Sequence, residues 1–456
     1  MIKSGKRSEK IEGILALTIA VLLIITAELA TGVLVKAKGN KVTTDFVVIA
    51  KENGLWLINL SKTDKEMLID KGGLFKTPSI SPDGQNIAYI KDKSLYVASI
   101  NLNQGKKEII KVSEQVLSYG WATSSDLAYS TEKGGLNGFN ATSKKFSYYI
   151  KSEEHYEQIS GDGKGTIYAS VFSYYTKEGY QYYKDRGIIS YNIALGKEKV
   201  VIPSEPISTD ASDTKDLGFL PEVAGISKDG AYVYIWCKVH SASINSDGVG
   251  FGVYEVKNNK FTAFNKEKIF ALAYNDNLSI NPLDGRFPVL NNGGARNMNI
   301  NKTLGVVDIL SGTFTPILPK DMIASTEALG FTAKGMVTMT PAFSPDGKKV
   351  IFSAANASEN MEKWHKEPHN IYTVDLQNKK VEKITEDNNF NFYPTYILKG
   401  EGIIFARVME GNTISLWKLQ GNKKESIATG IKLDEGSWYY GHFDLANSLD
   451  IYVSEE

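Results

Sequence analysis

Cysteine is almost absent from this chain of 456 residues, in which Cys237 is the single example. An internal disulfide needs two cysteines, so the fold has to be stabilised by burial of apolar side chains. No cysteine lies directly after the apolar segment near the N-terminus. This absence excludes a lipid-modified cysteine as a membrane anchor.

Excess charge of either sign is also lacking, because 52 lysines and arginines balance 52 aspartates and glutamates. A balanced chain has no overall field that would recruit nucleic acid or concentrate anionic substrates. We therefore expect no nucleic-acid partner.

Catalytic motifs are missing as well. A serine hydrolase needs a Gly-x-Ser-x-Gly elbow with an acid and a histidine, and the nearest string, Gly225–Gly230, fits a hairpin turn better. The sequence also lacks the spaced acidic residues of a calcium loop. We expect no catalytic residue, cofactor or metal. Paired carboxylates for glycoside cleavage stay open, because their separation is a property of the folded chain.

The N-terminus carries basic residues followed by a long apolar run. As a helix, residues 13–35 would reach about 34 Å, which is enough to cross a hydrocarbon core of about 30 Å. Residues 1–12 would form a cytoplasmic basic tail, residues 36–45 a linker and residues 46–456 an extracytoplasmic domain, by the positive-inside rule. The sequence thus predicts a single-pass membrane protein.

Two questions about this segment stay open. Small or tolerated residues at Val35-Lys36-Ala37 also fit a cleaved signal peptide, in which case the protein would be secreted. Glu28 lies inside the run, where an ionisable side chain is either functional or extends to the headgroups at the outer edge.

One turn motif occurs twice in nearly the same form. Pro78–Ile90 contains Ser81-Pro-Asp-Gly84, and Pro341–Ser353 contains Ser344-Pro-Asp-Gly347. Proline presets φ in the turn, aspartate can bond back to the main chain, and glycine accepts a positive φ at the exit. Both copies predict a β-hairpin, and a repeated hairpin has to stack with its neighbours to bury its apolar face.

Weaker copies of the strand, turn, strand pattern bring the number of turns to eight. They lie at Thr123–Asp126, Ser160–Gly163, Ser227–Gly230, Asn281–Gly285, Leu398–Gly402 and Ala446–Ser448. Runs rich in β-branched and aromatic residues follow most of them, and amphipathic helical patterns are nearly absent after residue 36. We expect an all-β fold in which four-stranded sheets repeat radially, that is, a β-propeller.

The two ends of the domain hold complementary pieces of one blade. Candidate strands at Phe46–Ala50, Leu55–Leu60 and Glu66–Ile69 open it, and a pair at Tyr439–Asp444 and Leu449–Val453 closes it. Pairing these pieces would hide the edges that an open sheet exposes, so we expect ring closure by the termini. One strand is left over, so a seven-bladed ring with one irregular unit is the alternative to the favoured eight blades.

The two Ser-Pro-Asp-Gly turns and the apolar runs that follow them resemble the TolB-like propeller repeat, a relative of WD-type repeats. The resemblance covers about a third of the chain. By that resemblance, TolB proteins are periplasmic six-bladed propellers preceded by a small α/β domain. The same repeat also caps prolyl oligopeptidase-like hydrolases. This chain has a predicted membrane span in place of the α/β domain, more blades and no hydrolase domain. Neither the role nor the partners of TolB transfer to it.

Three insertions are candidates for contact with a partner. The loop between two strands of the second clear repeat contains Trp364, which we expect to be an exposed aromatic residue. His365, Glu367 and His369 beside it offer a metal site as the alternative to a solvated loop, although Pro368 disfavours a regular helix there.

The second insertion, Tyr174–Arg186, is dense in tyrosines that include Tyr180, Tyr182 and Tyr183. They would form either a binding surface or a hairpin packed against neighbouring blades. The third insertion, Pro288–Asn301, contains Arg296 and would form either an anion site or a flexible turn.

The sequence therefore predicts a membrane-anchored extracytoplasmic propeller that binds a protein or peptide without catalysis. One alternative is a propeller hydrolase or lyase acting on cell-surface glycan or peptide through carboxylates at the channel mouth. The other is an extracytoplasmic sensor coupled to a membrane partner.

Overall fold

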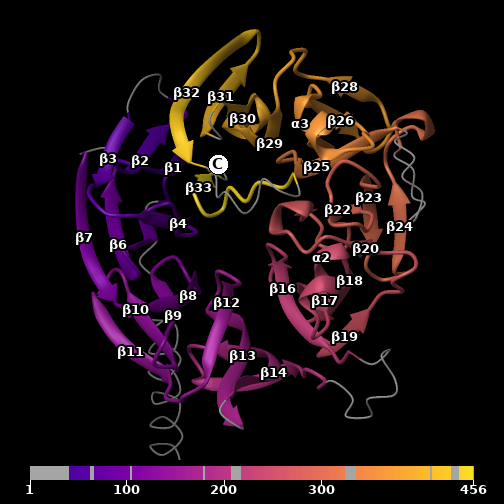
Figure 1. Ribbon diagram of the computed structural model, residues 1–456. Helices are drawn as coiled ribbons and strands as arrows, with labels where there is room; N and C mark the ends of the chain where they lie inside the picture. Colours follow the sequence, from indigo (N-terminus) through magenta and orange to yellow (C-terminus); the bar gives the residue numbers. More distant parts are fainter. Residues whose placement is uncertain are drawn as a thin grey trace, which may run out of the picture. The chain divides into compact units, whose positions relative to one another are not determined.

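A computed structural model describes residues 41–61, 66–102, 105–177, 180–206, 217–323, 335–410, 413–432 and 441–454, without the side chains of 177 and 180–183. Eight antiparallel sheets follow one another around a central axis (Figure 1). The all-β prediction and the favoured number of blades are therefore confirmed.

Glu28 and the apolar segment 13–35 lie outside the described residues. Within the described ranges, no helix has the length and apolar character that a membrane crossing requires.

Each blade is a four-stranded meander, named here in chain order and given from its innermost strand outward. Blade 1 contains β33 (Leu449–Tyr452), β1 (Phe46–Lys51), β2 (Gly54–Asn59) and β3 (Glu66–Asp70). Blade 2 contains β4 (Phe75–Ile80), β5 (Asn86–Lys91), β6 (Ser94–Asn101) and β7 (Lys106–Ser113). Blade 3 contains β8 (Val116–Trp121), β9 (Asp126–Thr131), β10 (Leu136–Asn140) and β11 (Lys145–Ile150). Blade 4 contains β12 (His155–Gly161), β13 (Thr166–Lys177), β14 (Tyr180–Asn192) and β15 (Lys197–Ile202).

The second half of the ring repeats this plan with added short elements. Blade 5 contains β16 (Leu220–Ile226), β17 (Tyr232–Lys238), β18 (Val249–Glu255) and β19 (Lys260–Ala263), with β20 (Phe270–Ala271) also paired to β18. Blade 6 contains β21 (Leu278–Ser279), β22 (Val289–Asn292), β23 (Thr303–Asp308) and β24 (Thr313–Pro316). Blade 7 contains β25 (Met336–Phe343), β26 (Lys349–Asn356), β27 (Asn370–Asp375) and β28 (Val381–Lys383). Blade 8 contains β29 (Asn391–Ile397), β30 (Gly402–Met409), β31 (Thr413–Gln420) and β32 (Lys423–Lys432). The helical elements among the described residues are α2 (Ala242–Asp247), α3 (Met361–Lys366), η1 (Asn275–Asn277), η2 (Lys320–Met322) and η3 (Leu398–Gly400).

The repeated turn joins the first and second strands of a blade. In blade 2 the Ser81 hydroxyl donates to Asp83 Oδ1 at 2.7 Å and accepts from the Asn86 main-chain N–H at 2.9 Å. Gly84 has a φ of 75°, which only glycine adopts without strain. Ser344 and Asp346 repeat the hydroxyl to carboxylate bond at 2.6 Å in blade 7. The hairpin prediction for both copies is confirmed.

One of the eight expected turns has a different place in the fold. Ala446–Ser448 precedes β33, so it enters the innermost strand of blade 1 instead of joining its first two strands. The strand expected at Tyr439–Asp444 is also wrong where the structure describes it, because residues 441–444 are not in a strand. His442 stacks on Tyr274 and Phe443 packs against Phe390 and Phe392, so both side chains are buried without strand pairing.

Ring closure joins the two ends of the chain as predicted. β1 pairs with β33 in antiparallel register, with Phe46 opposite Tyr452 and Ile49 opposite Leu449. Three strands from the start of the domain and one from its end thus complete blade 1. This arrangement accounts for the strand that the sequence count left over.

Asp45 fastens this closure. Its Oδ1 accepts from the main-chain N–H of Ser454 at 2.8 Å and from the Ser454 hydroxyl at 2.7 Å, and its Oδ2 accepts from the Leu398 N–H. Asp45 is only 2% exposed. One buried carboxylate therefore ties the beginning of the domain to its end and to blade 8.

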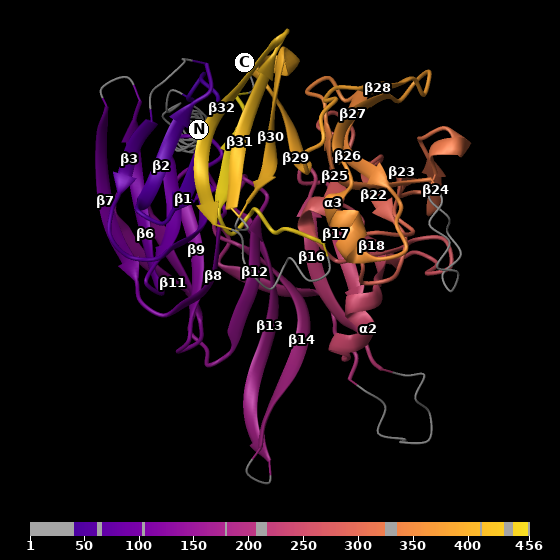
Figure 2. The same ribbon diagram turned by 45° about the horizontal axis from the view of Figure 1, so that its top comes forward.

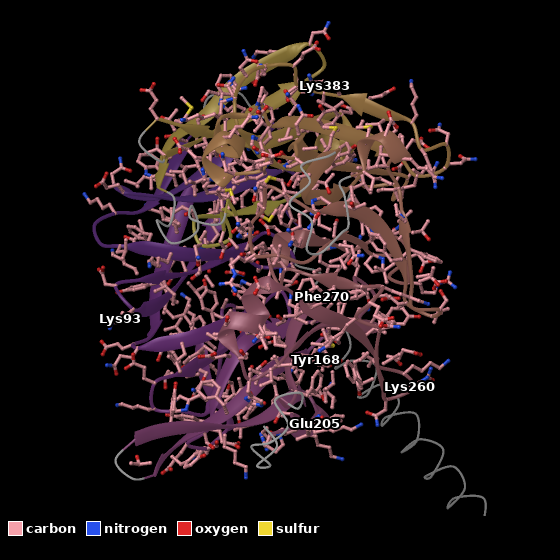
Figure 3. All side chains as sticks on the ribbon, turned by 45° about the vertical axis from the view of Figure 1, so that its right-hand side comes forward. Lys93, Tyr168, Glu205, Lys260, Phe270 and Lys383 are labelled. Carbon is pink, nitrogen blue, oxygen red and sulfur yellow. The ribbon has the colours of Figure 1, made fainter. Side chains whose placement is uncertain are left out.

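Exposed lysines lie on outermost strands of the ring. Lys93, Lys260 and Lys383 are exposed and lie toward the edges of the view in Figure 3, whereas Phe270 lies nearer its centre. Lys260 and Lys383 belong to the outermost strands β19 and β28. Lysines on edge strands oppose edge-to-edge aggregation, because pairing would bring their charges together.

We expect Asp45→Ala to destabilise the ring more than the same change in a repeat turn. The variant leaves three donors at the closure without their acceptor, which should cost about 3 kcal/mol in the free energy of unfolding. Asp83→Ala, the matched control, removes a carboxylate with contacts local in sequence and should cost about 1 kcal/mol. Urea unfolding of both variants measures the difference, and equal losses would contradict a special role of Asp45.

Candidate functional site

A cavity of about 340 Å³ lies among the innermost strands of blades 5 to 8. Its wall also includes part of the segment that leads into the closing strand, residues 441–448, which we call the C-terminal segment. Figure 1 shows this segment in yellow on the inner side of the ring, in the upper half of the view. The lining residues are Glu222, Ala273, Tyr274, Asn275, Asp276, Leu278, Thr340, Pro341, Ala342, Tyr393, Pro394, Thr395, His442, Asp444 and Ala446.

His442 attaches the C-terminal segment to blade 6. Its ring stacks on Tyr274 with centroids 3.6 Å apart, and its Nε2 lies 2.7 Å from Asp276 Oδ1. The side chains of His442 and Asp276 are 8% and 13% exposed. The second oxygen of Asp276, Oδ2, is buried and has no hydrogen-bond partner among the described residues. The cavity wall therefore contains a carboxylate oxygen that could accept a further donor.

Backbone irregularities shape the other side of the cavity. Thr340 and Tyr393 have φ values of 49° and 52°, and each lies where the pairing register of its innermost strand shifts. The Tyr393 N–H donates to Thr340 Oγ1 at 2.9 Å, so the bulge of blade 8 is tied to that of blade 7. Such β-bulges redirect side chains, here at the rim of the channel. The sequence signal for them is a proline directly after the bulged residue, as in Thr340-Pro341 and Tyr393-Pro394.

Several groups on the innermost strands have raised pKa values. Burial raises the pKa of Asp450, on β33, to about 6. Burial and the neighbouring Glu222 raise the pKa of Glu157. Burial, followed by the charges of Asp276, Asp450 and Asp444, raises the pKa of Tyr393. Carboxylates of one blade thus contribute to the raised pKa of Glu157 and of Tyr393 on other blades.

Two of these carboxylates have close partners within the protein. Glu222 forms an ion pair with Lys238, and Asp276 Oδ1 lies 2.7 Å from Nε2 of His442. The three carboxylates in the cavity wall are Glu222, Asp276 and Asp444. The wall is therefore acidic, with aromatic rings and prolines between the charges.

The expected interaction loop lies between β26 and β27, as predicted, but Trp364 is not exposed. The segment forms α3, capped by Asn360, and Trp364 is fully buried in the cluster that contains Phe390 and Phe443. The expectation of an exposed aromatic residue is therefore wrong, because this short helix turns its indole toward the core. Its role in binding a partner stays a prediction.

The two histidines of this loop are buried to different extents. His369 is fully buried, stacks on Phe390 at 3.5 Å and bonds through Nδ1 to the Glu367 carbonyl at 2.8 Å. Burial lowers the pKa of His369 to about 3 and that of His365 to about 4. In the part of the chain that the structure describes, no three or more His, Cys, Asp or Glu side chains are placed to hold a metal ion.

The tyrosine-rich insertion is a long β-hairpin made by β13 and β14. Figure 2 shows it extending away from the ring. Tyr174 and Tyr175 are 51% and 48% exposed. Tyr180, Tyr182 and Tyr183 lie on β14, and their side chains are outside the described residues. The exposed pair agrees with a contact surface better than with packing between blades.

Arg296 lies in the third insertion and is engaged within the protein. Its Nε and Nη2 donate to the two carboxylate oxygens of Asp247 at 2.7 and 2.6 Å. The guanidinium that we considered for an anion site therefore binds the carboxylate of Asp247 within the protein. The insertion is therefore a structural connection to α2.

No protein-family model matches the sequence, and no curated protein sequence matches it either. Among solved structures, dipeptidyl peptidase 4 from Porphyromonas gingivalis is similar with a TM-score of 0.52 at 10% identity, covering 83% of this chain and 57% of that chain. Apo AztD from Citrobacter koseri is similar with a TM-score of 0.49 at 10% identity, covering 90% and 98%. TolB from Acinetobacter baumannii is similar with a TM-score of 0.33 at 13% identity, covering 78% and 79%.

The class of protein follows from the sheet topology, because eight successive antiparallel sheets make the chain an eight-bladed β-propeller. Identities this low show the fold alone. The activities named for these proteins therefore do not transfer.

We expect Asp450→Asn to stabilise the protein at neutral pH. The folded carboxyl group, with its pKa raised to about 6, binds its proton more tightly than the unfolded one. Its contribution to stability is thus present below about pH 4 and lost as the pH rises through about 6. The variant should gain up to about 3 kcal/mol at pH 7 and lose this pH dependence.

Thermal unfolding between pH 4 and pH 7 measures this effect. Asp284→Asn is the control, because Asp284 is paired with Arg286 in the repeat turn of blade 6 and its hydrogen bond with Arg286 lowers its pKa. Parallel stability curves for the wild type and Asp450→Asn would contradict the prediction.

Proposed function

We propose that this protein is a non-catalytic binding module that takes a segment of a protein or peptide partner into the central cavity. The observation that carries the proposal is the cavity of about 340 Å³, which is walled by four blades and the C-terminal segment. Ligand sites are concave, and their volumes begin at about 300 Å³. The position inside the ring gives one ligand contact with several blades at once.

The chemistry of the wall supports binding. Its lining contains threonines but neither serine nor cysteine. Its acid–base pair, His442 and Asp276, stacks on Tyr274 and attaches the C-terminal segment, which is a structural role. A hydrolase or lyase that uses this pair is the second candidate, because the pair faces a cavity. Turnover of a bound ligand would favour that candidate.

The charge of the wall favours a basic partner. Glu222, Asp276 and Asp444 contribute three carboxylates, and the rings of Tyr274 and Tyr393 lie beside them. A lysine or arginine side chain would pair with the carboxylates and pack on the aromatic faces. Asp276 Oδ2, buried without a partner among the described residues, would accept one of its N–H groups.

The location that we propose rests on the sequence. The basic tail and the apolar run 13–35 support a membrane anchor, with the propeller outside the cytoplasm. The anchor would keep the binding face close to the membrane. Sensing through a membrane partner would be an extension of the same arrangement.

Peptides selected from a random library on the full chain in detergent should be enriched in lysine and arginine. Ala446→Trp places an indole at the cavity wall, where Ala446 is exposed, and should weaken their binding at least about tenfold by calorimetry. Asp276→Asn should weaken it by a similar factor, because it removes the charge and keeps the shape.

Ala242→Trp is the matched control, since Ala242 is exposed on α2 and does not line the cavity. Selected peptides that bind Ala446→Trp as well as the wild type would refute binding in the cavity. Binding that Ala446→Trp blocks but Asp276→Asn leaves intact would retain the cavity and refute its preference for basic side chains. Cleavage of the selected peptides would favour the enzyme.

A further inference from the structure

Lys302 is fully buried just before β23, and its ammonium group is surrounded by main-chain carbonyls. Its Nζ donates to the carbonyl oxygens of Gly294, Ala295, Asn297 and Ile300, each at 3.0 Å. Lysine is almost never fully buried unless it is paired. Here all four partners that the structure gives the ammonium are neutral carbonyls, which solvate it as the carbonyls of a potassium channel solvate an ion.

Burial and the four carbonyls act in opposite directions on the charged form of Lys302. Burial lowers the pKa of Lys302 to about 7. The four carbonyl oxygens oppose this shift, because their negative ends favour the charged form. A neutral amine also has fewer N–H groups to share among four acceptors than an ammonium has.

The backbone around Lys302 is strained so that the carbonyls point inward. We call residues 293–301 the Lys302 loop. Ala295 and Asn301 have φ values of 70° and 58°, in the left-handed region that non-glycine residues rarely adopt. Gly293 has a φ of 140°, and a Cβ there would lie 1.5 Å from the Asn301 carbonyl oxygen. A conformation of this cost persists only where surrounding contacts determine it, and the ammonium supplies four of them.

The loop bridges blades on either side of blade 6. The Ala295 N–H donates to the Asp247 carbonyl at 2.9 Å, next to the Arg296 pair with the same residue of α2. Asn299 Nδ2 donates to the Ser358 carbonyl at 2.7 Å, and the Ser358 N–H donates back to the Asn299 carbonyl at 3.1 Å. The loop therefore connects blade 5 with the insertion of blade 7.

The same loop also supports the C-terminal segment. Met298 is fully buried in the apolar cluster that contains Trp364 and Phe443. A Cβ on Gly441 would lie 3.3 Å from the Cβ of Met298 and 2.7 Å from the ring of Trp364. The residue after Gly441 is His442, which lines the cavity. A contact path thus runs from the Lys302 loop to the cavity wall.

We propose that the Lys302 loop is a binding site for a monovalent cation, that the ammonium of Lys302 occupies it, and that this internal cation positions the C-terminal segment over the cavity. Lys302 is a positioning residue in this scheme. The consequence for ligand binding rests on the proposed function, whereas the cation site stands on its own geometry.

Removal of the side chain should leave a site that a free cation can fill. In the full chain, Lys302→Ala should lower the unfolding temperature in sodium chloride. Ammonium or potassium chloride at equal ionic strength should restore part of the loss, because these ions fit the carbonyl distances that the lysine nitrogen sets. Lys302→Met, which fills the space without a charge, should be destabilised and insensitive to the cation.

Lys418 provides the matched control. It is also buried, but its Nζ donates to the single carbonyl of Leu60 at 2.6 Å. Lys418→Ala should be destabilised without any preference among cations. Rescue of both alanine variants to the same extent by every salt, or of neither, would overturn the cation site.

Hydrogen exchange tests the coupling to the cavity. In Lys302→Ala, amide exchange across residues 441–448 should be at least about tenfold faster in sodium chloride and should slow again in ammonium chloride. Lys302→Gln replaces the ammonium with a neutral amide donor and keeps most of the side-chain volume. The faster amide exchange of residues 441–448 can therefore be measured in this variant if the alanine variant fails to fold. Unchanged exchange of residues 441–448 in the folded variants would overturn the positioning role.

The two proposals fail in different ways. If no peptide binds the wild type in the cavity, the proposed function falls and cation rescue remains measurable. If rescue is absent while basic peptides bind, the cation site falls and the binding module stands.

Discussion

Every blade depends on its neighbours, because a four-stranded antiparallel sheet of this size leaves apolar faces and open edges that it cannot cover alone. The pairing of β1 with β33 is the contact that turns eight such sheets into a ring. Asp45 adds hydrogen bonds to Ser454 and to Leu398 of blade 8. Since the C-terminal segment leads directly into β33, the position of the cavity wall depends on the same closure.

The fold could be predicted from the sequence because its signals are local. The side chains of Ser81 and Asp83 make their hydrogen bonds within a few residues, so the turn can be recognised without knowledge of the rest of the chain. The error at residues 441–444 has a physical cause. Period-two alternation indicates that side chains are buried, and Phe443 is buried by neighbouring side chains although its backbone pairs with no strand.

The candidate site could not be predicted in the same way, since its contacts join distant parts of the chain. His442 and Asp276 are 166 positions apart, and neither stands in a motif. The sequence predicted that Trp364 lies in a loop between two strands. Its burial depends on contacts with Phe390 and Gly441, which lie outside that loop. The prolines after Thr340 and Tyr393 were the one local sign of the bulges that line the cavity.

Two buried polar groups in neighbouring parts of blade 6, the ammonium of Lys302 and the carboxylate of Asp276, differ in how fully they are hydrogen-bonded. At Lys302 the chain bends four carbonyls toward one ammonium and accepts left-handed backbone at Ala295 and Asn301 to do so. At Asp276 one carboxylate oxygen is buried without a donor among the described residues, which costs about 1–3 kcal/mol. The chain can therefore satisfy a buried polar group fully, as it does at Lys302, but it leaves Asp276 Oδ2 without a donor among the described residues. Asp276 lines the cavity, and under the proposed function a donor from a basic partner would recover that energy on binding.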